Sequence, residues 1–303
     1  MSATVVALGG NALVREGERG TVAEQRANLR EHCAALVPLL GEPLVVTHGN
    51  GPQVGAALLR SERAADEAPP LPLWLAVAQT QAEIGSLIGL ELGALAKRTV
   101  ATVVTHVRVD ADDPAFEEPT KPIGPFYSRD EASRLDTERG WRLVEDAGRG
   151  WRRVVPSPEP RAVVELDAVR RLLDDETIAV ACGGGGIPVV DRGGRLDGID
   201  AVIDKDLTSA LLATALGARR LVVLTDVPAV LRGYGTPDEE AVRSLTVAGA
   251  EALAPELAAG SMRPKVEACV RFARETGGEA LIASASGLAD ALEGKSGTRI
   301  GGE

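Results

Sequence analysis

Short, strongly apolar runs alternate with helical stretches along the whole chain, and this alternation limits the folds that the chain can adopt. The runs are rich in β-branched residues and occupy 4–8, 44–47, 99–105, 177–181, 202–203, 221–224 and 280–283. Apolar residues at helical spacing follow most of them, at 22–40, 52–60, 166–173, 207–216 and 266–273. Strands that alternate with helices predict an α/β protein whose mostly parallel sheet is covered by helices on both faces.

Composition supports a large core. The 303 residues are 45% hydrophobic, but only eight are aromatic (3 Phe, 3 Trp and 2 Tyr), so Ala, Val, Leu and Ile must fill the interior. This mixture suits a buried parallel sheet under Ala- and Leu-rich helices. The length fits one large domain or two lobes built on one sheet.

The net charge of the chain argues against nucleic acid and anionic membranes as partners. Acidic residues outnumber basic residues by 44 to 33, which gives a formal net charge of −11. Such a surface repels nucleic acid and anionic lipid, so we expect neither nucleic acid nor a membrane as a partner. Only five of the 33 basic residues are lysines, so a lysine within a motif stands out against the 28 arginines.

The cysteines and histidines indicate neither a disulfide framework nor a metal site. Cys33, Cys182 and Cys269 are scattered and odd in number, and the three histidines lack metal-ligand spacing. We interpret His48 as a residue that orients a turn, with a proton carrier as the alternative. The N-terminus lacks the features of a secretory signal, and no run approaches the ~18 apolar residues of a membrane span. We therefore expect a cytoplasmic protein.

One segment breaks the alternation. Residues 110–160 contain many prolines, two of the three tryptophans and no clear period. Structureless loops of this length are uncommon in compact domains. The segment is therefore either a large functional excursion or a small protruding subdomain.

Glycine-rich loops follow three of the predicted strands. They are Gly9-Gly10-Asn11, Gly49-Asn50-Gly51 and Gly183-Gly184-Gly185. Glycine lets backbone N–H groups approach an anion closely, and ligands of open α/β sheets bind beyond the carboxyl ends of the strands. A single loop is equally consistent with a tight turn, but three at successive strand ends favour an anion site.

Two familiar nucleotide-binding motifs do not fit. Residues 49–55 have one residue too many for G-x-G-x-x-G. Gly294-Lys295-Ser296 resembles the end of a P-loop, but Ala289 stands in place of the first glycine. A Rossmann dehydrogenase and a P-loop kinase therefore both lose support.

Two lysines occupy unusual positions. Lys205 lies in Asp204-Lys205-Asp206, which opens a predicted helix, and Lys265 falls in the first turn of another helix after the predicted N-cap Ser261. A cation at the positive end of a helix dipole is unfavourable by about 0.3–1 kcal/mol. Residues that break a local rule are expected at functional sites, here where lysines and helix N–H groups converge on phosphate. The alternative is a solvated lysine paired with its acidic neighbour.

Two further segments carry candidate residues. Lys121 has prolines on both sides in PTKPIG, which restrict its backbone, and a rigid surface loop is the alternative interpretation. Thr225 and Asp226 follow an apolar strand, where a nucleotide or Mg²⁺ is expected to bind. A capping role for Asp226 remains the alternative.

Nine segments, taken in chain order, resemble those of the carbamate kinases in the amino acid kinase family: ALGGNAL, THGNGPQVG, PTKPIGPFY, WRRVVPSP, GGGGIPVV, AVIDKDL, LTDVPAV, GSMRPKVEA and EGKSGTRI. The similarity runs from about residue 4 to about residue 300. The pair PTKPIGPFY and WRRVVPSP is specific, because most other amino acid kinases lack it.

The resemblance implies a three-layer α/β/α sandwich with a mostly parallel central sheet and a small protruding subdomain. It implies a single domain over residues 1–303. An acid-substrate part would cover about 1–200, the inserted subdomain about 110–160 and a nucleotide-binding part about 201–303. It also implies reversible phosphoryl transfer between ATP and carbamate with Mg²⁺, giving ADP and carbamoyl phosphate, and a homodimer.

The resemblance also implies roles for individual residues. The catalytic set is Lys121, Lys205, Asp206 and Lys265, in which Asp206 orients the lysines and the lysines neutralise charge on the phosphoryl group. The three glycine loops would bind substrate and phosphate. The nucleotide-binding set is Thr225, Asp226, Val227, Tyr234, Met262 and Pro264.

Residues 73–86 depart from the family pattern. The chain reads LWLAVAQTQAEIGS where carbamate kinases usually have an Asp and a stretch like AMSQGMIGY. The departure leaves open a kinase of the same fold that acts on another small acid. A non-catalytic nucleotide-binding regulator is the second alternative, and the presence of all three lysines argues against it.

Overall fold

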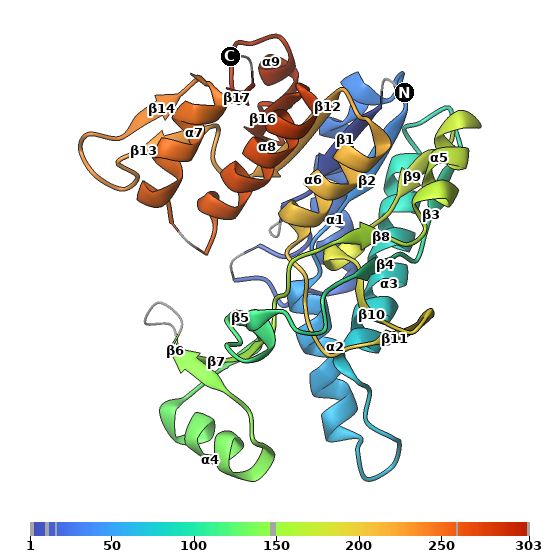
Figure 1. Cartoon of the computed structure of the whole chain (residues 1–303), viewed down its shortest axis with the longest axis vertical. Helices are drawn as coiled ribbons and strands as arrows, with labels where there is room; N and C mark the ends of the chain where they lie inside the picture. Colours follow the sequence, from blue (N-terminus) through green and yellow to red (C-terminus); the bar gives the residue numbers. More distant parts are fainter. Residues whose placement is uncertain (1–2, 10–11, 16, 146–149, 259, 302–303) are drawn as a thin grey trace.

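A large, mostly parallel sheet forms the centre of the computed structural model, which describes residues 3–9, 12–15, 17–145, 150–258 and 260–301 (Figure 1). Its eight strands follow the order β15-β17-β16-β12-β1-β2-β9-β3, and only the β16–β17 pair is antiparallel. The strands are β1 (Thr4–Ala7), β2 (Leu44–Thr47), β3 (Val100–Thr102), β9 (Ile178–Val180), β12 (Arg220–Thr225), β15 (Ser244–Leu245), β16 (Glu279–Ser284) and β17 (Thr298–Ile300). The predicted α/β fold class is confirmed.

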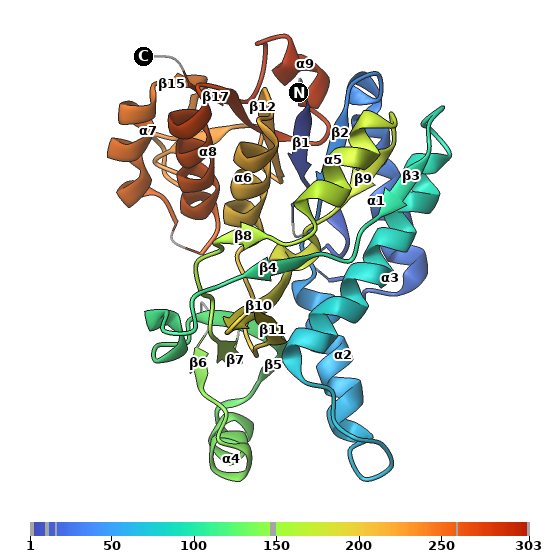
Figure 2. The ribbon, with the colours of Figure 1, turned by 45° about the vertical axis from the view of Figure 1, so that its right-hand side comes forward.

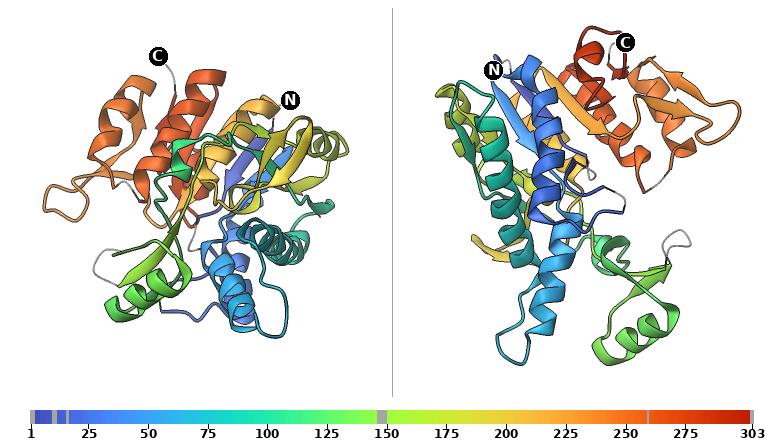
Figure 3. Two further views of the ribbon diagram at one scale, coloured as in Figure 1. Left: turned by 60° about the horizontal axis from the view of Figure 1, so that its bottom comes forward. Right: turned by 180° about the vertical axis from the view of Figure 1, so that it is seen from behind.

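Helices cover both faces of this sheet because its strands are apolar on both sides. Val5 and Ala7 of β1 face one core, whereas Val6 and Leu8 face the other. The first face carries α5 (Leu166–Asp174), α6 (Lys205–Leu216), α7 (Val247–Leu253) and α8 (Met262–Thr276). The second carries α1 (Val22–Ala35), α3 (Leu73–Gly93) and α9 (Leu288–Leu292) (Figure 3, right).

A second, four-stranded sheet crosses the lower part of the first face in the order β11-β10-β4-β8 (Figure 2). Its strands are β4 (His106–Arg108), β8 (Ala162–Val163), β10 (Ile187–Arg192) and β11 (Arg195–Gly198). A separate antiparallel hairpin, β13 (Val230–Arg232) with β14 (Glu240–Val242), follows β12. Short 3-10 turns join several elements, at η2 (Val37–Leu39), η3 (Pro114–Phe116), η4 (Gly183–Gly185) and η5 (Ala254–Glu256).

Residues 121–145 and 150–155 form a small unit that extends away from the main sheet (Figure 1). It contains β5 (Lys121–Tyr127), α4 (Arg129–Arg139), β6 (Leu143–Glu145) and β7 (Trp151–Val155), with the antiparallel strand order β5-β7-β6. We call this unit the subdomain. Its base packs on α2 (Gly51–Arg63), where a Cβ atom on Gly55 would lie 2.4 Å from the Cα of Gly124. Helix and hairpin therefore meet backbone to backbone at these two glycines.

Three local predictions differ from the structure. The first helix ends at Ala35 and not at residue 40, because Pro38 lacks the N–H that a continuing α-helix needs, and η2 follows instead. Residues 202–203 form no strand; they run as irregular chain to the start of α6, and Val202 N donates to Pro156 O at 3.0 Å. The strand predicted over 99–105 is regular only over Val100–Thr102.

The largest element that the sequence did not predict is α3, which contains the divergent residues 73–86. This helix packs against the main sheet through Ile84 and Ile88, and against the subdomain base through Ala76 and Val77. Apolar residues on several sides blur the helical period that a one-sided helix shows. Among the described residues, none of the helices combines the length and apolar character of a membrane span.

Candidate active site

Two lysines and one aspartate meet at the N-terminal ends of α6 and α8. Asp206 accepts a hydrogen bond from Lys205 Nζ at 2.5 Å through Oδ1 and from Lys265 Nζ at 3.0 Å through Oδ2. The two helices pack side by side, which brings together residues 59 positions apart in the sequence (Figure 2). The structure thus joins three of the four predicted catalytic residues in one cluster.

Burial sets the electrostatics of this cluster. The side chains of Lys205, Lys265 and Asp206 are only 13%, 14% and 5% exposed. Burial alone would raise the pKa of Asp206, but the two ammonium groups outweigh it and hold that pKa well below its usual range. Burial lowers the pKa of Lys205, whereas at Lys265 the Asp206 carboxylate outweighs burial and raises the pKa. Asp206 is therefore a fixed anion between two cationic groups.

The fourth predicted catalytic residue, Lys121, reaches the same helix end from the subdomain. Its Nζ donates to Asp204 Oδ2 at 2.7 Å. The other oxygen of Asp204 caps α6, accepting from the backbone N–H of Asp206 at 2.8 Å and of Leu207 at 3.4 Å. One carboxylate thus ties the start of β5 to the start of α6.

These groups line a cavity of about 210 Å³, which we call the transfer cavity. Its walls come from the β2–α2 loop, the start of β5, the η4 turn, the start of α6 and the start of α8. The lining residues are Gly49, Asn50, Gly51, Lys121, Pro122, Gly184, Val202, Ile203, Asp204, Lys205, Asp206, Gly260, Ser261, Pro264 and Lys265.

The glycine loops contribute unequally to this cavity. All three residues of the second loop line it, and so does Gly184 of the third loop. Gly183 packs on His48, where a Cβ would lie 2.4 Å from Nε2, and Gly185 packs on Ile203. Neither is among the described residues of the cavity wall, so both lie behind it.

The first glycine loop is described only in part. Gly9 packs under β12, where a Cβ would lie 2.9 Å from Leu224 O, and it is not among the described residues of the cavity wall. Gly10 and Asn11 lie outside the described residues.

His48 supports the second glycine loop from behind. It is fully enclosed, and its Nδ1 donates to Gly49 O at 2.9 Å, since a carbonyl oxygen can only accept. Burial, with a smaller contribution from Lys205, lowers the pKa of His48 to about 4 despite the bond to Gly49. The imidazole is therefore neutral near pH 7, which fits a residue that orients the turn.

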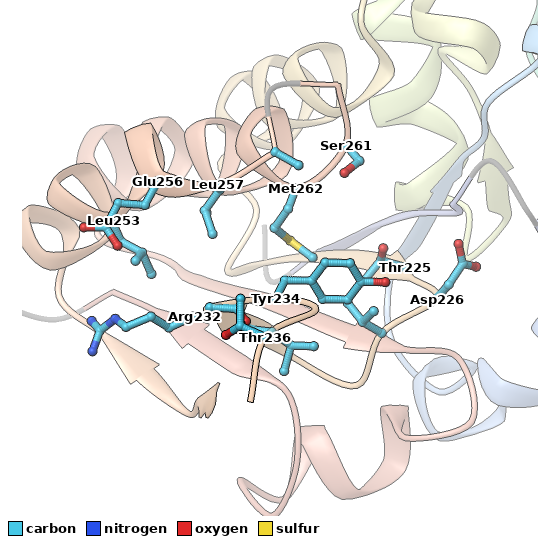
Figure 4. Close-up of a pocket in the computed structure, with 14 residues that line it drawn as sticks. Thr225, Asp226, Arg232, Tyr234, Thr236, Leu253, Glu256, Leu257, Ser261 and Met262 are labelled. Carbon is cyan, nitrogen blue, oxygen red and sulfur yellow. The ribbon is translucent and has the colours of Figure 1, made fainter. Parts of the chain in front are cut away.

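A second cavity, of about 530 Å³, adjoins the first and is called the nucleotide pocket below (Figure 4). Five of the six predicted nucleotide-binding residues line it, whereas Pro264 lines the transfer cavity. Met262 and the ring of Tyr234 extend into the pocket from opposite walls (Figure 4). Ser261 lines both cavities, so the two spaces meet at the start of α8. The described lining residues are Thr225, Asp226, Val227, Leu231, Arg232, Gly233, Tyr234, Thr236, Leu253, Glu256, Leu257, Ala258, Ser261 and Met262.

A cationic cavity beside a larger pocket, both at helix N-termini and strand ends of an α/β sheet, can bind a nucleotide and stabilise a transferring phosphoryl group. Residues 2–284 match the sequence model of the amino acid kinase family. The chain belongs to the amino acid kinase family.

Several carbamate kinases are similar to it over nearly their whole length. The carbamate kinase of Trichomonas vaginalis is 47% identical, with 98% of each chain covered. That of Thermococcus kodakarensis is 44% identical, with 99% of each chain covered. The solved structure of carbamate kinase from Giardia lamblia bound to AMP-PNP has a TM-score of 0.92 and 39% identity, covering 100% of this chain and 99% of that chain.

Three residues that were not singled out from the sequence line or support the wall of the transfer cavity. Asp204 precedes a predicted helix, and an Asp in that position is an N-cap signal that could have identified it. Thr80 and Gln81 lie in the divergent segment, and no local pattern marked them. Gln81 holds the backbone of Thr105 through both its amide atoms, at 2.8 and 3.0 Å, and Thr80 contacts the second glycine loop.

Proposed function

We propose that this chain is a carbamate kinase that transfers a phosphoryl group reversibly between ATP and carbamate, giving ADP and carbamoyl phosphate. The observation that carries the proposal is the buried cluster in which Asp206 holds Lys205 and Lys265 at the wall of the transfer cavity. Phosphoryl transfer requires positioning and charge stabilisation rather than covalent chemistry by the protein. Two ammonium groups held by one carboxylate provide such fixed charge.

In this proposal the three lysines have different roles. Lys205 and Lys265 neutralise the charge that develops on the transferring phosphoryl oxygens, and Asp206 keeps both ammonium groups in place. Lys121 adds a third cation to the cavity wall, from the subdomain. Its partner Asp204 also caps α6, so the helix N–H groups and Lys121 are positioned together.

The adenine nucleotide would occupy the nucleotide pocket, with its phosphates directed past Ser261 into the transfer cavity. The pocket is lined by apolar side chains such as Leu231, Leu257 and Met262, which suits a purine base. The small volume of the transfer cavity favours a small acid such as carbamate over a bulky amino acid derivative.

The residues present fit a Mg²⁺ ion that arrives with the nucleotide. Among the described residues, no group of three or more His, Cys, Asp or Glu side chains is arranged to hold a metal. Mg²⁺ at such sites is usually bound by substrate phosphates with one or two carboxylates. Asp226 lines the nucleotide pocket and contributes to raising the pKa of Lys265, so it is the carboxylate we expect near the ion. Bound Mg²⁺ would neutralise charge on the nucleotide phosphates.

The test is ATP formation from ADP and carbamoyl phosphate, with Mg²⁺ present and with acetyl phosphate and acetylglutamyl phosphate in parallel. Carbamoyl phosphate should give the highest kcat/KM. Folded protein that ignores carbamoyl phosphate but uses another acyl phosphate would show that the chain is a kinase for a different acid. Nucleotide binding without turnover of any acyl phosphate would favour a regulator.

We further propose a homodimer, supported by the family resemblance, and a cytoplasmic location. Light scattering should give twice the chain mass of 31.5 kDa at micromolar concentration, and a stable monomer would contradict the assembly. The location is supported by Cys33, Cys182 and Cys269, which are buried free thiols, as is usual in a reducing compartment.

A further inference from the structure

The amide group of Asn50 is clamped between two elements at the wall of the transfer cavity. On one side its Nδ2 donates to Thr80 Oγ1 of α3 at 3.0 Å. On the other side it lies flat on Gly184, where a Cβ would be 2.1 Å from Nδ2 and 2.4 Å from Oδ1. Asn50 is 3% exposed, so its amide has little freedom to move.

The contacts of Thr80 determine which way round this amide lies. The Thr80 hydroxyl has a single proton, and that proton is shared between Ala76 O at 2.9 Å and Val77 O at 3.0 Å. Toward Asn50 the hydroxyl can therefore only accept a hydrogen bond. The amide nitrogen must face Thr80, and the amide oxygen must face away from it.

Within the part of the chain that the structure describes, that oxygen is an acceptor without a donor. No described residue donates a hydrogen bond to Asn50 Oδ1. Fully enclosed side-chain atoms without a partner are found at Gln53 and Thr214 but not at Asn50, so Oδ1 is not fully enclosed. The cavity wall is otherwise dominated by cations, and the carboxylates of Asp204 and Asp206 are already bonded to lysines. A phosphate or carboxylate oxygen would be repelled by Oδ1, whereas an N–H group of a substrate would satisfy it.

We propose that Asn50 Oδ1 accepts a hydrogen bond from the amino group of the carbamoyl moiety, and that Thr80 is the positioning residue that fixes this orientation. The inference rests on the proposed function and adds the group that distinguishes carbamate from acids of the same size. Acetyl phosphate presents a methyl group where carbamoyl phosphate presents an amino group. Binding acetyl phosphate would leave Oδ1 unpaired, and a site with an unpaired polar group rejects such an analogue.

The experiment compares kcat/KM for carbamoyl phosphate and for acetyl phosphate, with ADP as acceptor, in the wild type, Thr80→Val and Thr80→Ser. Valine removes the hydroxyl and lets the Asn50 amide rotate by 180°. The ratio of kcat/KM for carbamoyl phosphate to kcat/KM for acetyl phosphate should therefore fall by about tenfold or more. Serine keeps the hydroxyl and should keep the ratio. Where acetyl phosphate turns over too slowly, its inhibition constant against carbamoyl phosphate replaces its kcat/KM.

Each outcome has one meaning. An equal loss with both acyl phosphates in Thr80→Val would indicate a structural role only and would overturn the inference, as would a Thr80→Ser protein that behaves like Thr80→Val. If Thr80→Val does not fold, as judged by thermal unfolding, Asn50→Ser gives the same test, because it removes the amide oxygen. A wild-type protein inactive with carbamoyl phosphate would instead refute the proposed function, before any variant is considered.

Discussion

The transfer cavity and the nucleotide pocket lie next to each other but are built in different ways. In the transfer cavity Lys205 and Lys265 are buried, Lys121 is partly exposed, and each of the three is paired with a carboxylate, whereas in the nucleotide pocket Tyr234 is 70% exposed. The first is small and charged; the second is more than twice as large and lined mainly by apolar groups, at about 210 against 530 Å³. Fixed charge suits stabilisation of a transition state, and an apolar pocket suits binding of a base.

The two sites also differ in how the chain assembles them. The described residues that line the nucleotide pocket all lie within 225–262, in one stretch of sequence. The transfer cavity draws on residues from 49 to 265, including the subdomain. Substitutions that disturb the transfer cavity should therefore alter the rate constant, even where the substituted residue lies outside the cavity. Substitutions in the nucleotide pocket should alter nucleotide affinity.

The largest effect is expected from the lysines of the cluster. Lys205→Met and Lys265→Met should each lower kcat by about 10²–10³-fold, the usual loss when one preorganised donor is removed, with KM for ADP nearly unchanged. Steady-state kinetics with carbamoyl phosphate measures both constants. Each variant leaves Asp206 with a single ammonium partner, so a lower melting temperature is also expected and should be measured alongside.

Lys295 provides the matched control for this prediction. It is exposed and pairs with Glu293, outside both cavities, so Lys295→Met should keep wild-type activity. An essential Lys295, together with tolerance of methionine at Lys205 and Lys265, would place the chemistry elsewhere.

A smaller effect is expected from a glycine that touches no substrate. In Gly55→Ala the new methyl group would lie 2.4 Å from the backbone of Gly124, so the subdomain must shift and carry Lys121 with it. Misplacement by about 1 Å can cost up to 10²-fold, and we expect a 10- to 100-fold loss of kcat/KM for carbamoyl phosphate. ADP binding, measured by calorimetry, should not change.

Gly89→Ala is the control for this variant. Gly89 lies within α3, and nothing lies within 4 Å of its added Cβ, so alanine should be neutral or slightly stabilising there. Equal losses in the two variants would show that the Gly55 contact does not position the subdomain.

Tyr234 should show the opposite kinetic pattern, with a smaller effect. Tyr234→Ala removes a ring that extends into the nucleotide pocket, and KM for ADP should rise about threefold to tenfold at constant kcat (Figure 4). Tyr234→Phe keeps the ring and should keep the wild-type KM. A fall in kcat without a change in KM would remove the distinction between the two sites.

The smallest effect concerns stability and pH at the wall of the transfer cavity. Burial depresses the pKa of His48 from 6.5 to about 4, so only the unfolded chain gains this proton as the pH falls through 6.5. The stabilisation from neutral His48 is complete above about pH 6.5. It decreases progressively as the pH falls from 6.5 to about 4. Between pH 7.5 and 6 the loss is about 0.8 kcal/mol.

Urea unfolding at both pH values measures this loss, with His48→Gln as the reference. The wild type should lose more unfolding free energy than the variant over this interval. Equal losses would mean that the pKa of the His48 imidazole is the same in the folded state as in the unfolded chain.

Much of the fold could be predicted from the sequence, because strand and helix signals are local. The alternation of apolar runs and helices predicted the mostly parallel sheet, and β2 has the predicted bounds. Helix α3 was missed because it is apolar on several sides, so its period is weak. The β-branched residues 202–203 favour a strand by their type, but their backbone forms none, because their side chains are buried in irregular chain that leads to α6.

The candidate site divides along the same line. Sequence by itself determined that Lys205 and Asp206 open a helix and that Lys265 lies in the first turn of another, because caps and first turns depend on adjacent residues. Only the tertiary structure decided that Lys265 bonds to the same carboxylate as Lys205, that of Asp206. It also decided that Lys121 pairs with Asp204, 83 positions away, and in which direction the Asn50 amide oxygen points. Such pairings depend on how helices and strands pack against one another, and no local sequence pattern specifies that geometry.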